Sequence, residues 1–192
     1  MTKNIEIEFK TVVTKEKYLG LLKHFDLENN IFKQVNHYFD TDDYELNANS
    51  IVLRIRQKGE SRFKVTLKSQ GEKEAYENHV FISKEQAQDM IQNGFNTQDF
   101  FDNIENKFVR FVVSLDNYRA SIPYHGGTLF LDRCDYCNTV DYEIEFEFNT
   151  YDEGKQIFDQ FLKDQHIELK PTKRKSERAF TCKRWPSGHL FY

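Results

Sequence analysis

The stretch NIEIEFK, residues 4–10, alternates charged and apolar side chains. A β-strand sends successive side chains to opposite faces, so one face of this segment carries Glu6, Glu8 and Lys10 and the other face is apolar. An ordinary half-exposed strand with its charges in solvent would have the same pattern. The later strands therefore have to decide which face points inward.

Later segments of the chain alternate in the same way, and their charges are sorted by sign. The segments 50–58 and 62–68 carry basic residues, whereas the segment 141–148 carries acidic ones. Solvated strand faces usually mix both signs, because like charges opposed across a ladder destabilise the sheet. The sorting favours charged faces that meet across an interior. The residues are Arg54, Arg56, Lys58, Arg62, Lys64, Lys68, Glu143, Glu145 and Glu147, with Arg119 and Asp132 on two further strands.

Four segments have the apolar spacing of amphipathic helices, and they begin after Thr14, Ser83, Thr97 and Thr150. Ser83 with Gln86, and Thr150 with Glu153, have the spacing of a capping box, and Gly94 is placed to end the second helix. Such helices need an apolar surface to cover. The sequence therefore predicts a sheet-dominated α+β fold with an apolar exterior under helices and a charged interior.

Composition sets the class of protein. The chain has 192 residues, 39% of them hydrophobic, and no linker divides it, so we predict one domain over 1–192 with a short tail at 183–192. The net charge of −4 speaks against a nucleic-acid protein. No apolar run reaches the ~20 residues of a membrane span and no signal peptide opens the chain, which predicts a cytoplasmic protein without a membrane partner. A homodimer stays an open alternative.

The three cysteines fit reduced thiols better than a disulfide framework. Cys134 and Cys137, in CDYC, have the spacing of metal ligands. A structural zinc site needs four ligands, and no second pair of cysteines exists, so zinc binding would require Cys182 and a histidine. Zinc or redox use of this motif is the weaker alternative.

A charged interior has a consequence for the ligand. Buried charges cost several kcal/mol each unless they are paired or bind a metal. A tunnel lined by carboxylates together with guanidinium and ammonium groups therefore predicts a polyanion that is bound with divalent cations.

The motif Glu6-x-Glu8-x-Lys10 resembles the ExExK signature of the CYTH-domain family, the triphosphate tunnel metalloenzymes. Further segments resemble the blocks of that family in their usual order, over about residues 4–182. They are HYFDT (37–41), LRIR (53–56), FKVTLK (63–68), the strand of Arg119, LFLD (129–132), DYEIEFE (141–147) and KSER (175–178). Thr66 and the CDYC motif depart from the pattern, and the loose fit of EAYENHV leaves the facing of Glu77 open.

The resemblance implies an antiparallel eight-stranded β tunnel that binds a small-molecule triphosphate or nucleotide with Mg or Mn. It implies metal ligands at Glu6, Glu8, Glu145 and Glu147, and catalytic roles for Glu143, Glu145 and Lys10. Glu145 with one or both of Glu143 and Glu147 would complete the metal and water site, and which of the three bind metal and which bind water stays open. The implied phosphate-binding residues are Lys10, Arg54, Arg56, Lys64, Lys68, Arg119, Lys175 and Arg178.

Three functions follow from this resemblance. The first is a metal-dependent hydrolase of tripolyphosphate or a similar triphosphate, such as thiamine triphosphate, because hydrolysis needs only a phosphate clamp, metal and water. The second is a class IV-type adenylate cyclase, which needs a nucleobase pocket as well. The third is a noncatalytic module that binds polyphosphate or nucleotides. Because the carboxylates are all present, the sequence favours the hydrolase.

Overall fold

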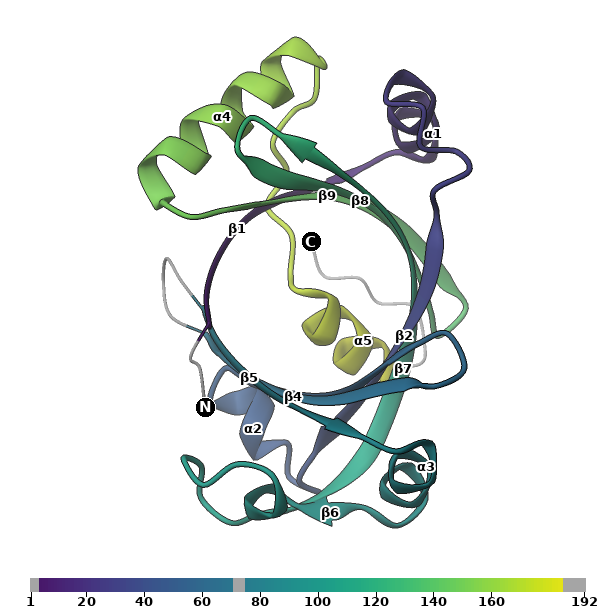
Figure 1. Cartoon of the computed structure of the whole chain (residues 1–192), viewed down its shortest axis with the longest axis vertical. Helices are drawn as coiled ribbons and strands as arrows, with labels where there is room; N and C mark the ends of the chain where they lie inside the picture. Colours follow the sequence, from purple (N-terminus) through teal and green to yellow (C-terminus); the bar gives the residue numbers. More distant parts are fainter. Residues whose placement is uncertain (1–3, 71–74, 185–192) are drawn as a thin grey trace.

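The computed structural model describes residues 4–70 and 75–184, leaving aside the side chains of Asn4, Ile5, Glu6, Gln70 and Arg184. In this part of the chain, eight strands close into an antiparallel ring in the order β2-β3-β4-β5-β1-β9-β8-β7, and β7 pairs again with β2 (Figure 1). The two-residue β6 (Phe95–Asn96) is added to β7. The ring strands are β1 (Asn4–Val13), β2 (Phe32–Asp40), β3 (Ile51–Lys58), β4 (Arg62–Gln70), β5 (Ala75–Ile82), β7 (Phe108–Tyr124), β8 (Gly127–Tyr136) and β9 (Thr139–Phe148).

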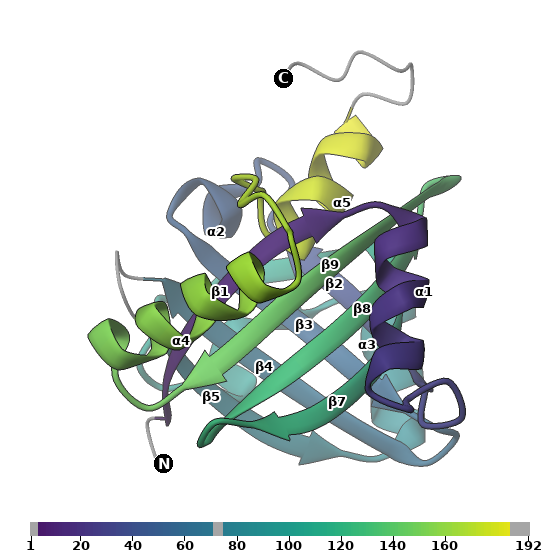
Figure 2. The ribbon, with the colours of Figure 1, turned by 90° about the horizontal axis from the view of Figure 1, so that it is seen from above.

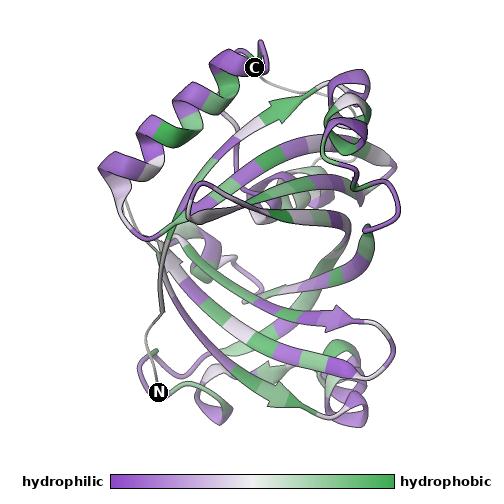
Figure 3. Ribbon diagram, turned by 45° about the horizontal axis from the view of Figure 1, so that its top comes forward, coloured by the Kyte–Doolittle hydropathy of each residue, from purple (hydrophilic) through white to green (hydrophobic). Residues whose placement is uncertain are grey.

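The register of the strands decides which residues face the interior. Residues directly opposite each other on antiparallel strands share a face. Lys10 lies opposite Glu145, and Arg56 lies opposite Lys64, so each pair shares a face. Lys10, Arg56 and Glu145 line one pocket, so these charged faces point into the ring. Ile55 and Val65, which are fully buried, belong to the apolar outer face. The alternation of hydropathy along the strands is visible in Figure 3.

Helices cover the apolar outside of the ring, as the sequence predicted. α1 (Lys15–His24) and α4 (Tyr151–Asp164) pack over β1, β8 and β9 in one apolar cluster. On the other side, α3 (Lys84–Asn93), the 3₁₀ turn η1 (Thr97–Asp99) and α2 (Glu45–Ala48), which the sequence did not predict, cover β3 and β4. The α+β tunnel with a charged interior is therefore confirmed.

A helix that the sequence did not predict, α5 (Lys175–Arg184), lies at one mouth of the ring instead of outside it (Figures 1 and 2). It buries Ala179 and Phe180 against Tyr38 and Leu115, which face the interior. The helix runs past the predicted start of the tail at 183, and residues 185–192 lie outside the described part.

The helix ends test two predicted caps. At α3, Ser83 Oγ accepts from the Gln86 amide at 3.1 Å and Gln86 Oε1 accepts from the Ser83 amide at 2.9 Å, which confirms this capping box. Gly94 ends the helix with a φ of 81°. The box predicted at Thr150 is wrong, because Thr150 Oγ1 contacts the Glu153 carboxylate at 3.3 Å and accepts no amide proton there.

The cysteine prediction is also wrong. Cys137, in the β8–β9 turn, forms a disulfide with Cys182 of α5. Cys134 is a free thiol that is fully buried in the interior. Because Cys137 is consumed by the disulfide, the CDYC pair cannot act together as zinc ligands.

No helix among residues 4–70 and 75–184 combines the length and the apolar character needed to cross a membrane.

Candidate active site

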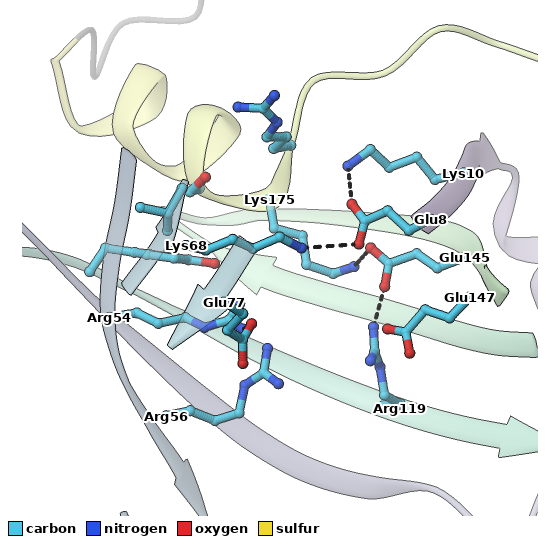
Figure 4. A pocket seen from close by; sticks show the side chains of 14 residues that line it. Glu8, Lys10, Arg54, Arg56, Lys68, Glu77, Arg119, Glu145, Glu147 and Lys175 are labelled. Carbon is cyan, nitrogen blue, oxygen red and sulfur yellow. Dashed lines mark hydrogen bonds and ion pairs between the residues drawn. The ribbon is translucent and has the colours of Figure 1, made fainter. Parts of the chain in front are cut away.

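A pocket lies inside the ring, beside the first turn of α5 (Figure 4). Seven of its fourteen lining residues are basic and four are acidic, so the pocket is positive although the whole chain carries −4. Such a pocket attracts anions. Its lining residues are Glu8, Lys10, Tyr38, Val52, Arg54, Arg56, Lys68, Glu77, Arg119, Glu145, Glu147, Arg174, Lys175 and Ser176.

Most of the residues implied by the family resemblance meet at this pocket. Lys64, Glu143 and Arg178 face the interior but do not line the pocket, and the side chain of Glu6 lies outside the described part. Those that line it are Glu8, Lys10, Arg54, Arg56, Lys68, Arg119, Glu145, Glu147 and Lys175.

Glu145 is the centre of the acidic side of the pocket. Lys175 Nζ donates to Glu145 Oε1 at 2.7 Å, and Arg119 Nη2 donates to Glu145 Oε2 (Figure 4). Burial by itself would raise the pKa of Glu145, but the cations of Lys175 and Arg119 outweigh it and hold this pKa well below its usual range. Glu145 is therefore an ionised carboxylate fixed from two sides.

Asp132 lies behind Glu145 and orients its two partners. It is fully buried, and its carboxylate accepts from Arg119 Nε at 2.7 Å and Nη2 at 2.6 Å. Lys175 Nζ lies 2.8 Å from the same carboxylate. Arg119 also stacks over Phe130, with its guanidinium carbon 4.1 Å from the ring centroid. The sequence placed Asp132 on a charged strand but assigned it no role at the site.

Glu143 lies deeper than the pocket wall. Its carboxylate accepts from Lys175 Nζ and from Arg178 Nη2, and its side chain is fully buried. Burial raises the pKa of Glu143 to about 7, with the Glu145 charge acting in the same direction and Lys175 and Arg178 opposing it. Arg178 also pairs with Asp141, with Nε 3.0 Å from Oδ2. These contacts anchor α5 to β9.

Glu8 forms the second acidic point of the pocket. It accepts from Lys10 Nζ at 3.0 Å and from Lys68 Nζ at 3.4 Å (Figure 4). Burial and the charge of Glu145 would raise the pKa of Glu8, yet Lys68 and Lys10 lower it to about 2.

The basic side of the pocket is formed by β3 and β4 with a single carboxylate from β5. Glu77 lies 3.3 Å from Arg54 Nη2 and 3.5 Å from Lys64 Nζ, which settles its open facing: it points into the ring. Arg56 donates through Nε to the amide oxygen of Asn36 at 2.9 Å. Burial, followed by the charges of Arg54 and Arg119, lowers the pKa of Arg56 to about 9. The positive charge of Arg56 is therefore only partly balanced by nearby carboxylates.

The carboxylates of the pocket fit a hard divalent cation such as Mg²⁺ or Mn²⁺. Glu8, Glu145 and Glu147 offer oxygen donors on the pocket wall, the ligand type that these ions prefer. A second group, made of Asp132, Glu143 and Glu145, brings ligand oxygens within 4.8 Å of one another. Lys175 Nζ contacts every carboxylate of this second group. Glu8, Glu145 and Glu147 on the pocket wall are therefore the better fit for a metal.

Comparison with known proteins identifies the family. The family model described as the CYTH domain matches residues 4–180. The chain belongs to the CYTH family. Its CYTH relatives include "Putative triphosphatase YjbK" of Bacillus subtilis, which is 34% identical over 188 residues and matches 96% of this chain and 98% of that protein.

Two solved structures share the CYTH fold of this chain. A Bacillus halodurans protein, described as a "putative adenylate cyclase", has a TM-score of 0.84 at 34% identity, with coverage of 94% of this chain and all of that chain. HpAC1 from Hippeastrum, described as a "putative adenylyl cyclase" that reveals a dominant triphosphatase activity, has a TM-score of 0.71 at 20% identity. It covers 94% of this chain and 95% of its own, and this likeness shows the fold alone.

Proposed function

We propose that this CYTH protein is a divalent-metal-dependent hydrolase of a small triphosphate, in which water attacks a phosphoryl group inside the ring. The observation that carries the proposal is the excess of basic side chains in the pocket of an acidic chain. A triphosphate supplies several negative charges in a short linear ligand, which suits a pocket of this kind. We further propose that a single domain over residues 1–192 carries this activity in the cytoplasm, with no membrane or nucleic-acid partner.

The basic side of the pocket holds the phosphate oxygens in this proposal. Arg54, Arg56 and Lys68 act as the clamp from β3 and β4, and Lys64 supports it through Glu77. Arg56 has the most to gain, because its lowered pKa reports an electrostatic cost that an anion would remove. The same fixed charges stabilise the transition state, in which negative charge is spread over phosphoryl oxygens.

The acidic side holds the metal and the water. Glu8, Glu145 and Glu147 would bind Mg²⁺ or Mn²⁺, together with Glu6 of the same motif. The bound ion supplies positive charge to the phosphates and makes a water more acidic. Lys10, which contacts Glu8, lies where it can hold a phosphate oxygen beside these carboxylates. We assign Glu143 and Arg178 to positioning α5, since neither lines the pocket.

One assay separates the candidate functions. Purified protein is incubated with tripolyphosphate, thiamine triphosphate or ATP, with Mg²⁺ or Mn²⁺, and the products are separated. Release of orthophosphate supports the hydrolase. Formation of pyrophosphate with cyclic AMP would support the cyclase, the activity in the description of the Bacillus halodurans relative. Tight binding of tripolyphosphate without any product would leave a noncatalytic binding module.

A further inference from the structure

The disulfide between Cys137 and Cys182 joins the ring to α5. The two residues are 45 positions apart in the chain, with their Cα atoms 6.4 Å from each other. Cys137 is in the tight turn between β8 and β9, and Cys182 is near the end of α5. The bond therefore fixes the far end of a helix whose first turn forms part of the pocket wall.

The turn that holds Cys137 is itself unusual. Cys137 and Asn138 both have positive φ, at 43° and 61°. A two-residue hairpin turn of this type favours Asn and Gly, because other side chains are strained in this conformation. Asn138 suits the turn, whereas a cysteine at position 137 has a conformational cost. Strained backbone of this kind persists where a functional constraint holds it, and here the constraint points the thiol of Cys137 to α5.

α5 carries the pocket residues Lys175 and Ser176 in its first turn, seven and six residues before Cys182. A helix of this length moves as a rigid rod, so a tether at Cys182 also limits the position of Lys175. Lys175 must stay within reach of Glu145 and Asp132 to keep its contacts at 2.7 and 2.8 Å. The connection that enters α5, residues 165–174, contains no helix or strand, and the Lys170 amide in it donates to Thr11 Oγ1 of β1 at 2.9 Å.

Other contacts also hold α5, and the first of them are the ion pairs of Lys175 with Asp132, Glu143 and Glu145. Ala179 and Phe180 pack on the interior wall, and Arg178 pairs with Glu143 and Asp141. The opposite side of the helix is exposed at Thr181 and Lys183 and half-buried at Glu177. Loss of the tether removes one of these restraints, and we expect it to raise the fraction of molecules in which α5 is unseated while the ring stays folded.

We propose that Cys137–Cys182 is a redox-controlled latch that sets how firmly α5 closes the pocket. In the oxidised chain, α5 is seated and Lys175 completes the pocket wall. In the reduced chain, α5 leaves the mouth in part of the molecules and takes Lys175 with it. This effect on substrate rests on the proposed function, whereas the movement of α5 does not.

The exchange step needs a dithiol as reductant. Its two thiols deliver two electrons and two protons to the bond between the Sγ atoms, Cys137 and Cys182 become thiols, and the dithiol leaves as its own disulfide. Cys137 is exposed in its turn, so a reductant can reach the bond. Cys134 does not take part, because it is a fully buried free thiol.

Hydrogen exchange measured by mass spectrometry tests the latch directly. The full chain is compared before and after treatment with dithiothreitol, and peptides from α5 are followed alongside peptides from α4, which packs on the opposite, outer face of the ring. We expect faster exchange in α5 after reduction and no change in α4. Cys137→Ser should exchange fast in α5 under both conditions, and Cys134→Ala should respond as the parent does.

Kinetics with tripolyphosphate give the second readout. If α5 is seated in about a fifth of the reduced molecules, the KM rises about fivefold on reduction, while Cys137→Ser has the higher KM throughout. Equal α5 exchange in the oxidised and reduced chain would overturn the proposal, as would three titratable thiols in the protein after mild oxidation. If no triphosphate is hydrolysed in either state, the proposed function fails, and the exchange experiment still decides on the latch.

Discussion

The two sides of the pocket face each other across the ring but differ in how their charges are balanced. On the acidic side, Glu145 is paired with Lys175 and Arg119, two cations of the chain itself. On the basic side, Arg54 and Lys64 share the single carboxylate of Glu77. Among the described residues, no carboxylate pairs with Arg56, whose pKa is lowered to about 9. The charge of Glu145 on the acidic side is thus balanced within the chain, whereas the basic side has positive charge left for a ligand.

Removal of divalent metal is expected to have the largest effect on the rate of triphosphate hydrolysis. EDTA should reduce triphosphate hydrolysis to background, because without a metal the carboxylates of Glu8 and Glu147 repel the phosphates. The rate is measured in Mg²⁺, after EDTA, and after Mg²⁺ is restored in excess. Turnover that persists in EDTA would assign the acidic side a purely structural role.

Arg56→Ala tests the basic side. We expect kcat/KM for tripolyphosphate to fall about 100-fold, because a charge-assisted contact to a phosphate contributes about 2–3 kcal/mol. Arg62→Ala is the matched control, since Arg62 is an exposed arginine on β4 that does not line the pocket. Steady-state kinetics of both variants decide the outcome. Equal losses in the two variants would remove the distinction between clamp and surface charge.

In the absence of metal, a substitution on the acidic side should lower the free energy of unfolding more than a substitution on the basic side. Glu145→Gln removes one of the buried carboxylates that balance Lys175 and Arg119 and leaves Asp132 to pair with both, so we expect the free energy of unfolding to fall by about 2–4 kcal/mol. Arg56→Met removes a poorly balanced cation and should change it by no more than about 1 kcal/mol. Urea titrations measure both, with Glu60→Gln in the exposed β3–β4 turn as the control. A destabilised Arg56→Met beside an unaffected Glu145→Gln would reverse our assignment.

The smallest expected effect is the pH dependence due to Glu8. The pKa of Glu8 is about 2 in the folded chain, against an ordinary value of 4.5. Between these values the unfolded chain binds more protons, so this contribution is complete above pH 4.5 and is lost as the pH falls towards 2. It amounts to about 1–3 kcal/mol. Thermal melts from pH 2 to 6 should show a shallower acid loss for Glu8→Gln, and identical profiles would contradict the pairing with Lys10 and Lys68.

Strand alternation was enough to predict the charged interior, but it gives the face of a residue and not its depth. Glu143 and Glu145 are two residues apart on β9 and both point inward, yet only Glu145 lines the pocket. The difference depends on α5, whose Lys175 and Arg178 cover Glu143. No sequence pattern reports such a cover.

Neither α5 nor the disulfide could be predicted from the sequence. α5 packs on a charged interior, so it carries only a short apolar face around Ala179 and Phe180 and lacks the periodicity of the outer helices. The partner of Cys137 is 45 residues away, and cysteine spacing does not encode connectivity. The sequence did not decide which face of β5 carries Glu77, because β5 has polar residues on both faces and Asn78 is buried on the outside.

The closure of the ring by β2 and β7 also bears on how the chain reaches its native state. His37 and Ser114, whose side chains are hydrogen-bonded at 2.7 Å across this seam, are 77 residues apart in sequence. Contacts between such distant segments require the entropy of a long loop to be overcome first, so they slow folding. Until the seam forms, the edges of β2 and β7 are open to pairing with another chain, and afterwards both are covered. Dilute conditions during refolding should therefore favour the native ring over aggregates.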